Sequence, residues 1–204
     1  MKRRWTIALL FCALLLSAIL ASANHEPSAE EREANEIRIG LAIAPVHLDL
    51  KGKDFRQVGL GSYIVNAQAV CAECHSCPTY STGRNPYLGQ PKKWDPADYL
   101  AGGVPFGPFV SRNITPDSTG KPAGLTRAQF KHVMRTGEDP ENPGELLQVM
   151  PWPYFQDMTH HNLDAIYEYL SAIPSQVTPP AGSCSGAQRI CAGTAASTRA
   201  STLP

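Results

Sequence analysis

The sequence predicts an all-α domain within a chain of 204 residues. Apolar residues recur at helical spacing in three stretches, residues 55–69, 126–137 and 159–174. The segments between them are rich in proline and glycine, which interrupt both long helices and packed sheets. We therefore expect one core domain at residues 55–174, with an extension at each end.

The N-terminus has the pattern of an export signal. Three basic residues at positions 2–4 precede an apolar run at 7–20, and the cleavage motif A-S-A follows at 21–23. This pattern predicts a signal peptide at residues 1–23 and a mature protein in a periplasmic or other extracytoplasmic space. A retained membrane anchor is the alternative, because the apolar stretch approaches the roughly 20 residues that span a bilayer.

The charge balance argues against one class of partner. The whole chain has 18 basic and 18 acidic side chains, and loss of the three basic residues in the signal would leave 15 against 18, a formal charge of −3. Nucleic-acid-binding domains carry a clustered basic surface. We expect no nucleic-acid partner.

The stretch between the signal and the core, residues 24–54, is predicted to be an N-terminal extension. Residues 24–36 are polar and acidic, which favours a mobile segment. Residues 37–54 alternate apolar and polar side chains and contain a proline, a pattern typical of a short extended arm.

Each predicted core helix has a start or stop signal. The first, at 55–69, runs directly into a cysteine cluster. Thr126 is a favourable N-cap for the second helix, and Gly137 ends it. Thr159 precedes the third helix, and Pro174 stops it. The remaining residues, 175–204, are rich in Pro, Ser, Thr, Ala and Gly, which predicts a flexible low-complexity tail.

Residues 77–124 form an unusually long irregular segment. Irregular runs of this length in a compact domain usually serve a function. They also need something to pack around, and a large flat prosthetic group would supply the missing core.

The sequence C-A-E-C-H at residues 71–75 indicates which group this is. Two thiols three residues apart lie on one side of a helical turn, where they can bond to two vinyl groups on one edge of a haem. The motif predicts one covalent haem c held by Cys71 and Cys74, with His75 as the proximal iron ligand. We expect the other ring nitrogen of His75 to bind a backbone carbonyl in the loop at residues 83–91.

A zinc site is the main alternative for this cluster, with His75 and the cysteines at positions 71, 74 and 77 as ligands. Structural zinc sites usually draw on two separated ligand pairs, and the next cysteine after Cys77 is Cys184. A chance cluster of thiols also stays open. We expect Cys184 to pair with Cys191, and a bond between Cys77 and the tail is the alternative.

The second iron ligand has six candidates outside the signal: Met134, Met150, Met158, His132, His160 and His161. Met134 falls on the apolar face of a predicted helix, where a core role is favoured. Met150 lies in a loop and is followed by Pro151, which restricts the backbone. A methionine thioether favours ferrous iron in a low-spin, six-coordinate haem. We predict that Met150 is the ligand.

Four segments of the chain resemble a known family. They are "GLGSYIVNAQAVCAECHSC", "YLAGGVPFGPFVSRNITPD", "GLTRAQFKHVMRTG" and "MPWPYFQDMTHHNLDAIYEYLSAIP". Together, over residues 55–174, they are similar to single-haem class I c-type cytochromes, including cytochrome subunits of periplasmic dehydrogenases. The resemblance implies a class I cytochrome c fold, with crossed N- and C-terminal helices beside the haem, and it supports His75 and Met150 as iron ligands.

The resemblance also implies that the loop at residues 111–116 lies near the haem. Arg112 or Asn113 would then bind a propionate of the cofactor. A turn stabilised by the asparagine and the following proline is the alternative reading of this loop.

These residues predict a one-electron carrier and not an enzyme. Its partners would be redox proteins, namely a donor dehydrogenase and an acceptor oxidase or second cytochrome. The alternative is a peroxidase-like or gas-binding protein with an open sixth iron position, for which His132 and Arg135 are the recognisable pair. Membrane attachment is expected only if the signal segment is retained.

Overall fold

The computed structural model describes residues 26–180 and Cys184. The chain forms two units, residues 1–35 and 36–204, and the boundary between them falls inside helix α2 (Ala29–Ile43). The predicted signal peptide lies outside the described residues, and so does most of the predicted tail. None of the helices in the described part combines the length and apolar character needed to cross a membrane.

Helix α2 differs from what the sequence predicts for the N-terminal extension. A capping box starts it: the Ser28 N–H donates to the Glu31 carboxylate at 2.7 Å, and the Glu31 N–H donates to the Ser28 hydroxyl at 3.2 Å. The prediction of an extended arm is wrong for residues 37–43, which are helical, while residues 44–54 form no helix or strand.

In the second unit, α2 meets helix α3 (Phe55–Tyr63) at two glycines. A Cβ atom on Gly40 would overlap the Gly59 carbonyl oxygen, so the contact requires glycine. The Ser62 hydroxyl donates to the Gly40 carbonyl at 2.7 Å. This close approach covers one side of α3.

The first predicted core helix is confirmed, with two additions. A π-helical turn, η1 (Ile64–Gln68), follows α3, and Val70 then takes a left-handed conformation with φ 48°. The short helix α4 (Cys71–His75) begins after this break. The cysteine motif therefore forms its own helical turn.

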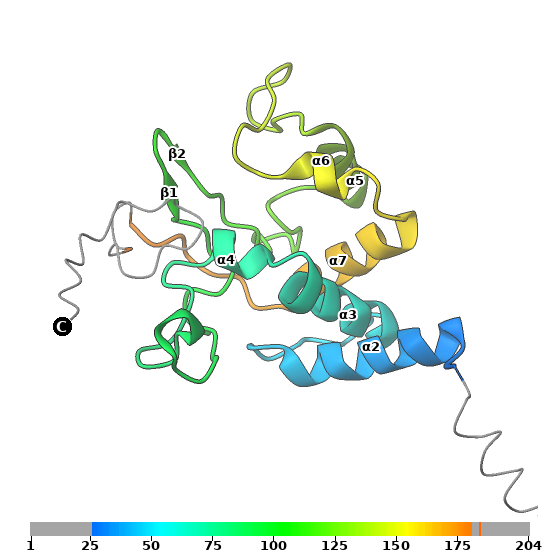
Figure 1. Ribbon diagram of the computed structural model, residues 1–204. Helices are drawn as coiled ribbons and strands as arrows, with labels where there is room; N and C mark the ends of the chain where they lie inside the picture. Colours follow the sequence, from blue (N-terminus) through cyan, green and yellow to red (C-terminus); the bar gives the residue numbers. More distant parts are fainter. Residues whose placement is uncertain (1–25, 181–183, 185–204) are drawn as a thin grey trace, which may run out of the picture. The chain divides into compact units, whose positions relative to one another are not determined.

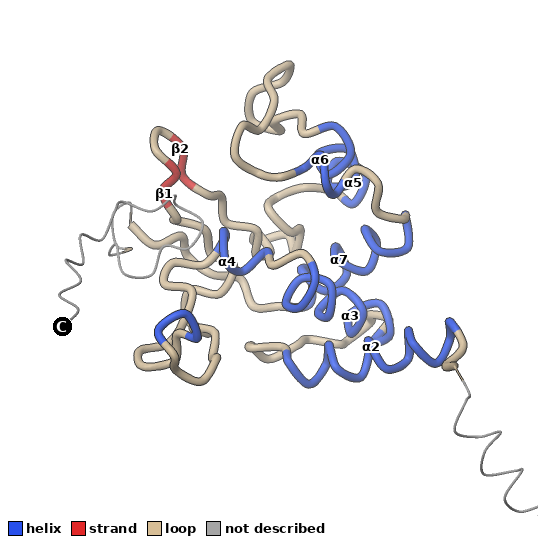
Figure 2. Tube along the Cα trace, viewed as in Figure 1, coloured by secondary structure: helices blue, strands red, loops and turns tan. Residues whose placement is uncertain are grey.

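The long segment after α4 is mostly irregular, as predicted (Figure 2). It contains the 3-10 helix η2 (Pro86–Leu88) and a hairpin of two short strands, β1 (Pro105–Phe106) and β2 (Phe109–Val110). The strands are antiparallel, with Pro105 opposite Val110. Because of this hairpin the fold is mainly α and not all-α. The class I cytochrome c fold stays a prediction.

The other two predicted helices are confirmed. Helix α5 (Arg127–Thr136) has a capping box between Thr126 and Gln129, and Gly137 ends it with φ 69°. Helix α7 (His160–Ala172) begins after Thr159, whose hydroxyl accepts from the Asn162 N–H at 3.1 Å. A further short helix, α6 (Trp152–Phe155), lies between them in a segment predicted as loop.

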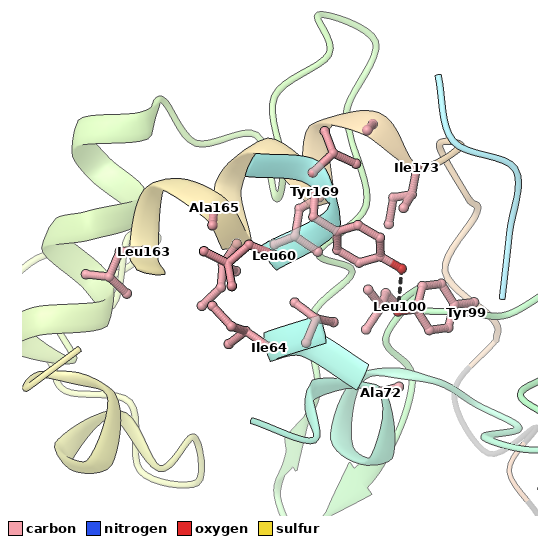
Figure 3. Packing of buried hydrophobic residues seen from close by; sticks show 14 of the residues in the cluster. Leu60, Ile64, Ala72, Tyr99, Leu100, Leu163, Ala165, Tyr169 and Ile173 are labelled. Carbon is pink, nitrogen blue, oxygen red and sulfur yellow. Dashed lines mark hydrogen bonds between the residues drawn. The ribbon is translucent and has the colours of Figure 1, made fainter. Parts of the chain in front are cut away.

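Helices α3 and α7 lie side by side and form the central crossing of the second unit (Figure 1). A Cβ atom on Gly61 would overlap the Ala165 carbonyl oxygen, so the two backbones are in contact. Buried side chains of α3, η1 and α7 pack around this point together with Tyr99 and Leu100 (Figure 3). The crossing supports α4, which follows η1 closely in the chain.

A buried polar network stiffens the same core. The Tyr99 hydroxyl donates to the Asn66 side-chain oxygen at 2.6 Å. It also lies 2.9 Å from the Tyr169 hydroxyl (Figure 3). Asn66 in turn donates to the Ser62 carbonyl at 3.0 Å. A satisfied network of this kind specifies one packing arrangement. It links η1, which precedes the cysteine motif, to α7.

Candidate functional site

The cysteine motif on α4 lines a cavity of about 1150 Å³. Its volume exceeds the roughly 300–1,000 Å³ of ordinary small-molecule pockets. The residues that the sequence predicts as cofactor contacts all line it: Cys71, Cys74, His75, Arg112, Asn113 and Met150. The fold therefore brings these distant residues together around a space suited to a large group.

Apolar side chains from four parts of the chain form most of the cavity walls. They come from the hairpin, α5, α7 and the loop before α6: Phe106, Phe109, Val110, Phe130, Val133, Met134, Ile166, Leu170, Leu146, Leu147 and Val149. Polar residues are fewer, and Arg112, Asp139 and Glu141 form one contacting cluster. Mostly apolar walls with a few convergent polar groups are typical of cofactor sites.

One hydrogen bond orients the imidazole of His75. Its Nδ1 lies 2.8 Å from the Arg112 carbonyl oxygen. A carbonyl can only accept, so Nδ1 carries the proton and Nε2 keeps its lone pair. Burial lowers the pKa of His75, while the Arg112 carbonyl acts in the opposite direction. A neutral imidazole with a fixed tautomer is the form that ligates a metal.

The position of this acceptor corrects the prediction that placed it at residues 83–91. The Gly102 N–H donates to the His75 carbonyl at 2.7 Å, and the Gly103 N–H donates to the Ser111 carbonyl at 2.9 Å. These bonds bring the segment containing Arg112 next to α4. The loop at 83–91 instead closes on itself, since the Asn85 N–H donates to the Gln90 side chain at 2.9 Å.

Burial raises the pKa of the Cys71 thiol to about 12, and a backbone hydrogen bond offsets this only in part. The thiol is therefore protonated at neutral pH. Reactive cysteines have lowered pKa values and are accessible as thiolates. The raised pKa therefore argues against a redox-reactive role for Cys71.

Cys77 forms a disulfide with Cys184, and their Cα atoms are 5.5 Å apart. The predicted bond between Cys184 and Cys191 is therefore wrong, and Cys191 lies outside the described residues. Within residues 26–180 and Cys184, no group of three or more His, Cys, Asp or Glu side chains is arranged to hold a metal ion. The zinc alternative loses the Cys77 thiol, which the disulfide occupies.

Met150 is partly buried, packs against the core and lines the cavity. The Trp152 N–H donates to the Met150 carbonyl at 2.8 Å, and the Leu147 N–H donates to the Gly137 carbonyl at 2.8 Å. Met134 also lines the cavity but is buried in the core, as its helical position predicts. Met158 and the three candidate histidines do not line it.

Arg112 and Asn113 have protein partners of their own. The guanidinium of Arg112 lies 2.7 Å from Asp139 and 3.1 Å from Glu141. The Asn113 side chain donates to the Gln176 carbonyl at 2.8 Å and accepts from the Thr115 N–H at 2.9 Å. Sequence patterns do not indicate Asp139, because a single acidic residue in a loop has no distinctive spacing.

Two curated proteins are similar to this chain over 120 residues at 37% identity. Both are named "Alcohol dehydrogenase (quinone), cytochrome c subunit", one from Gluconacetobacter polyoxogenes and one from Komagataeibacter europaeus. The match covers 57% of this chain and 22% of each relative, so the chain spans about a fifth of their length. No family model and no solved structure matches the chain. The similarity supports a cytochrome c-type family and an electron-carrier role.

Proposed function

We propose that this chain is an exported c-type cytochrome with one covalent haem, which carries one electron at a time between redox proteins. In this proposal Cys71 and Cys74 bind haem c, and His75 and Met150 ligate its iron. The observation that carries the proposal is the shared cavity: the C-x-x-C-H turn and Met150, far apart in the sequence, line the same largely apolar space.

The residues present fit the cofactor. Cys71 and Cys74 belong to one helical turn of α4, which suits attachment to two vinyl groups on one porphyrin edge. His75 keeps the Nε2 lone pair for the iron because Nδ1 is bound to Arg112. The apolar walls suit a porphyrin ring, and Arg112 with Asn113 would suit its propionates.

Haem iron supplies a reversible one-electron couple when bound. The chain's own residues hold and orient that group. The Arg112 carbonyl fixes the His75 ring, and the Met150 thioether is a soft ligand that favours the ferrous state. Phe130, Ile166 and Leu170 keep water away from the site, because they are apolar wall residues of the cavity.

The identity of the relatives supports a partner class. They are named as cytochrome c subunits of a quinone alcohol dehydrogenase. We propose by analogy that a periplasmic dehydrogenase delivers electrons to this chain and that an oxidase or second cytochrome accepts them. The chain itself would then break no substrate bond.

The open-site alternative has less support from the site. His132 lies 2.6 Å from Glu138 on an exposed surface, and Arg135 donates to the Gln156 carbonyl. Neither residue lines the cavity. A peroxidase-like or gas-binding site would need such a pair beside the iron.

Optical spectra of the haem-matured protein test the proposal. Oxidised, reduced and CO-treated reduced samples are compared. We expect a low-spin c-type spectrum that CO leaves unchanged, because Met150 fills the sixth position. A marked shift with CO would contradict ligation by Met150, and a protein without any haem band would overturn the whole proposal.

A further inference from the structure

Asp139 belongs to the loop that leads to Met150, residues 138–150, and its carboxylate contacts Arg112, whose carbonyl orients His75. Its carboxylate is 2.7 Å from the Arg112 guanidinium, and the carbonyl of the same arginine accepts the hydrogen bond from His75. We propose that Asp139 is a positioning residue, which acts through Arg112 to hold the Met150 loop in place relative to His75. The inference rests on the proposed haem ligation.

The pair between Asp139 and Arg112 is partly sheltered from water. The exposed fraction of the side chain is 13% for Asp139 and 33% for Arg112, whereas it is 71% for Glu141, the second partner of the arginine. Exposed ion pairs contribute little, and sheltered, charge-assisted hydrogen bonds contribute more. Asp139 is therefore the partner that fixes the guanidinium.

The Asp139 carboxylate is also held by its own loop. It accepts from the Glu141 N–H at 2.8 Å and from the Asn142 side chain at 3.2 Å. Burial acts to raise the pKa of Asp139, but these bonds and the one from Arg112 outweigh it and lower the pKa. The carboxylate is charged at neutral pH and bonded on both oxygens.

Backbone hydrogen bonds connect Asp139 to the part of the loop that precedes Met150. The Asp139 N–H donates to the Glu145 carbonyl at 2.8 Å, and the Leu147 N–H donates to the Gly137 carbonyl at 2.8 Å. The loop is thus closed shortly before Met150. An anchor at Asp139 therefore restrains the loop as far as Leu147, shortly before Met150.

The other end of the ion pair is equally fixed. The Gly103 N–H donates to the Ser111 carbonyl at 2.9 Å, and the Ser111 N–H donates to the Val104 carbonyl at 2.8 Å. These bonds hold the backbone next to Arg112, which in turn holds the His75 ring at 2.8 Å. This ion pair therefore joins two restrained segments, and the more exposed Glu141 is the weaker second partner of Arg112. Loss of the Asp139 charge would loosen the link between the two segments.

The test compares two isosteric variants of the holo protein, Asp139→Asn and Asp164→Asn. Asp164 pairs with Lys131 at 3.0 Å, its side chain is 30% exposed, and it does not line the cavity. It controls for the general loss of a partly buried ion pair. Two quantities are measured: the affinity of the ferric protein for imidazole, which competes with the methionine sulfur for the iron, and the free energy of unfolding in urea.

We expect Asp139→Asn to raise the imidazole affinity roughly tenfold, which corresponds to about 1.4 kcal/mol. Asp164→Asn should lower stability without changing the imidazole affinity, because Asp164 and its partner Lys131 do not line the cavity. Asp139→Glu retains the charge, so its imidazole affinity should lie closer to that of the wild type. Glu141→Gln should change the imidazole affinity little, because Glu141 is exposed.

Equal imidazole affinity in the wild type and in Asp139→Asn would overturn the positioning role and leave ligation by Met150 intact. An equal rise in imidazole affinity in Asp139→Asn and Asp164→Asn would also overturn the positioning role, because general destabilisation would then explain the rise in both variants. Wild-type protein that binds CO fully would overturn the proposed ligation and the positioning role together.

Discussion

The backbone of Arg112 lies against Gly102, so that a Cβ atom on Gly102 would be 2.5 Å from the Arg112 carbonyl carbon. The same glycine donates its N–H to the His75 carbonyl at 2.7 Å. It also has φ 77°, a conformation that side chains disfavour. The turn with the histidine and the segment that orients it therefore meet at a residue that has to be glycine.

Gly102→Ala is expected to destabilise the protein strongly. The positive φ costs an alanine roughly 1–2 kcal/mol, and the clash with the Arg112 backbone adds about 1–3 kcal/mol. Urea unfolding measures the loss. Gly83→Ala is the matched control, because Gly83 has φ 72° but a Cβ atom added to it would have no neighbouring atom within 4 Å. Equal losses in the two variants would contradict the close approach at Gly102.

The two methionines of the cavity separate ligation from packing. Both Met150 and Met134 line it, but Met134 is 4% exposed and belongs to the core, whereas Met150 is only partly buried. Met150→Ala should make the reduced protein bind CO. Met134→Ala should instead cost about 2–5 kcal/mol of stability without opening the iron to CO. CO difference spectra measure whether the iron is open, and urea unfolding measures the loss of stability. CO binding that is confined to the Met134 variant would assign the iron ligand to Met134.

The disulfide between Cys77 and Cys184 closes a loop across 107 residues. Constraining the unfolded chain over a loop of about 100 residues stabilises a protein by up to roughly 4–5 kcal/mol in the chain-entropy account. Cys184→Ser should therefore lower the free energy of unfolding by about 2–5 kcal/mol. Peptide mapping without reduction identifies the bond directly. A peptide that joins Cys184 to Cys191 would contradict the observed pairing.

Stability should depend on pH through Asp164. Burial acts to raise its pKa, but hydrogen bonds from Lys131 and Arg127 lower it below the ordinary 3.8. A carboxyl with a lowered folded-state pKa stabilises the fold above its unfolded pKa, and this stabilisation is lost as the pH falls through the folded-state pKa. Asp164→Asn should be less stable than the wild type at neutral pH, and the difference should shrink as the pH falls below 3.8. Urea midpoints across this range measure it, and a constant difference would argue against the assignment.

Local signals account for the parts of the fold that the sequence predicts well. Thr126 and Thr159 cap the helices that follow them directly, and Gly137 ends α5. The C-x-x-C-H turn is equally local. The same kind of signal, Ser28 with Glu31, starts α2. The prediction does not use this signal, because the alternating pattern after Glu36 is typical of an extended arm.

Contacts between distant segments are what the sequence does not reveal. The acceptor for His75 lies 37 residues away at Arg112, and it is reached because Gly102 permits two backbones to touch. For Cys77 the sequence leaves two readings open, and the structure has the alternative one, a partner 107 residues away in the tail. Asp139 is 27 residues from Arg112 and gains its role only from that contact. In each case the chemistry of the residue is visible in the sequence, but its partner is set by packing.

The most direct test of the central claim is the intact mass of the matured protein under denaturing, reducing conditions, compared with that of a Cys71→Ala, Cys74→Ala double variant. A covalent haem survives denaturation, whereas a metal ion or a haem bound by ligands alone does not. We predict a mass increase of one haem in the wild type and none in the double variant. A wild-type mass equal to that of the polypeptide alone would contradict the proposal that this cavity holds a c-type haem.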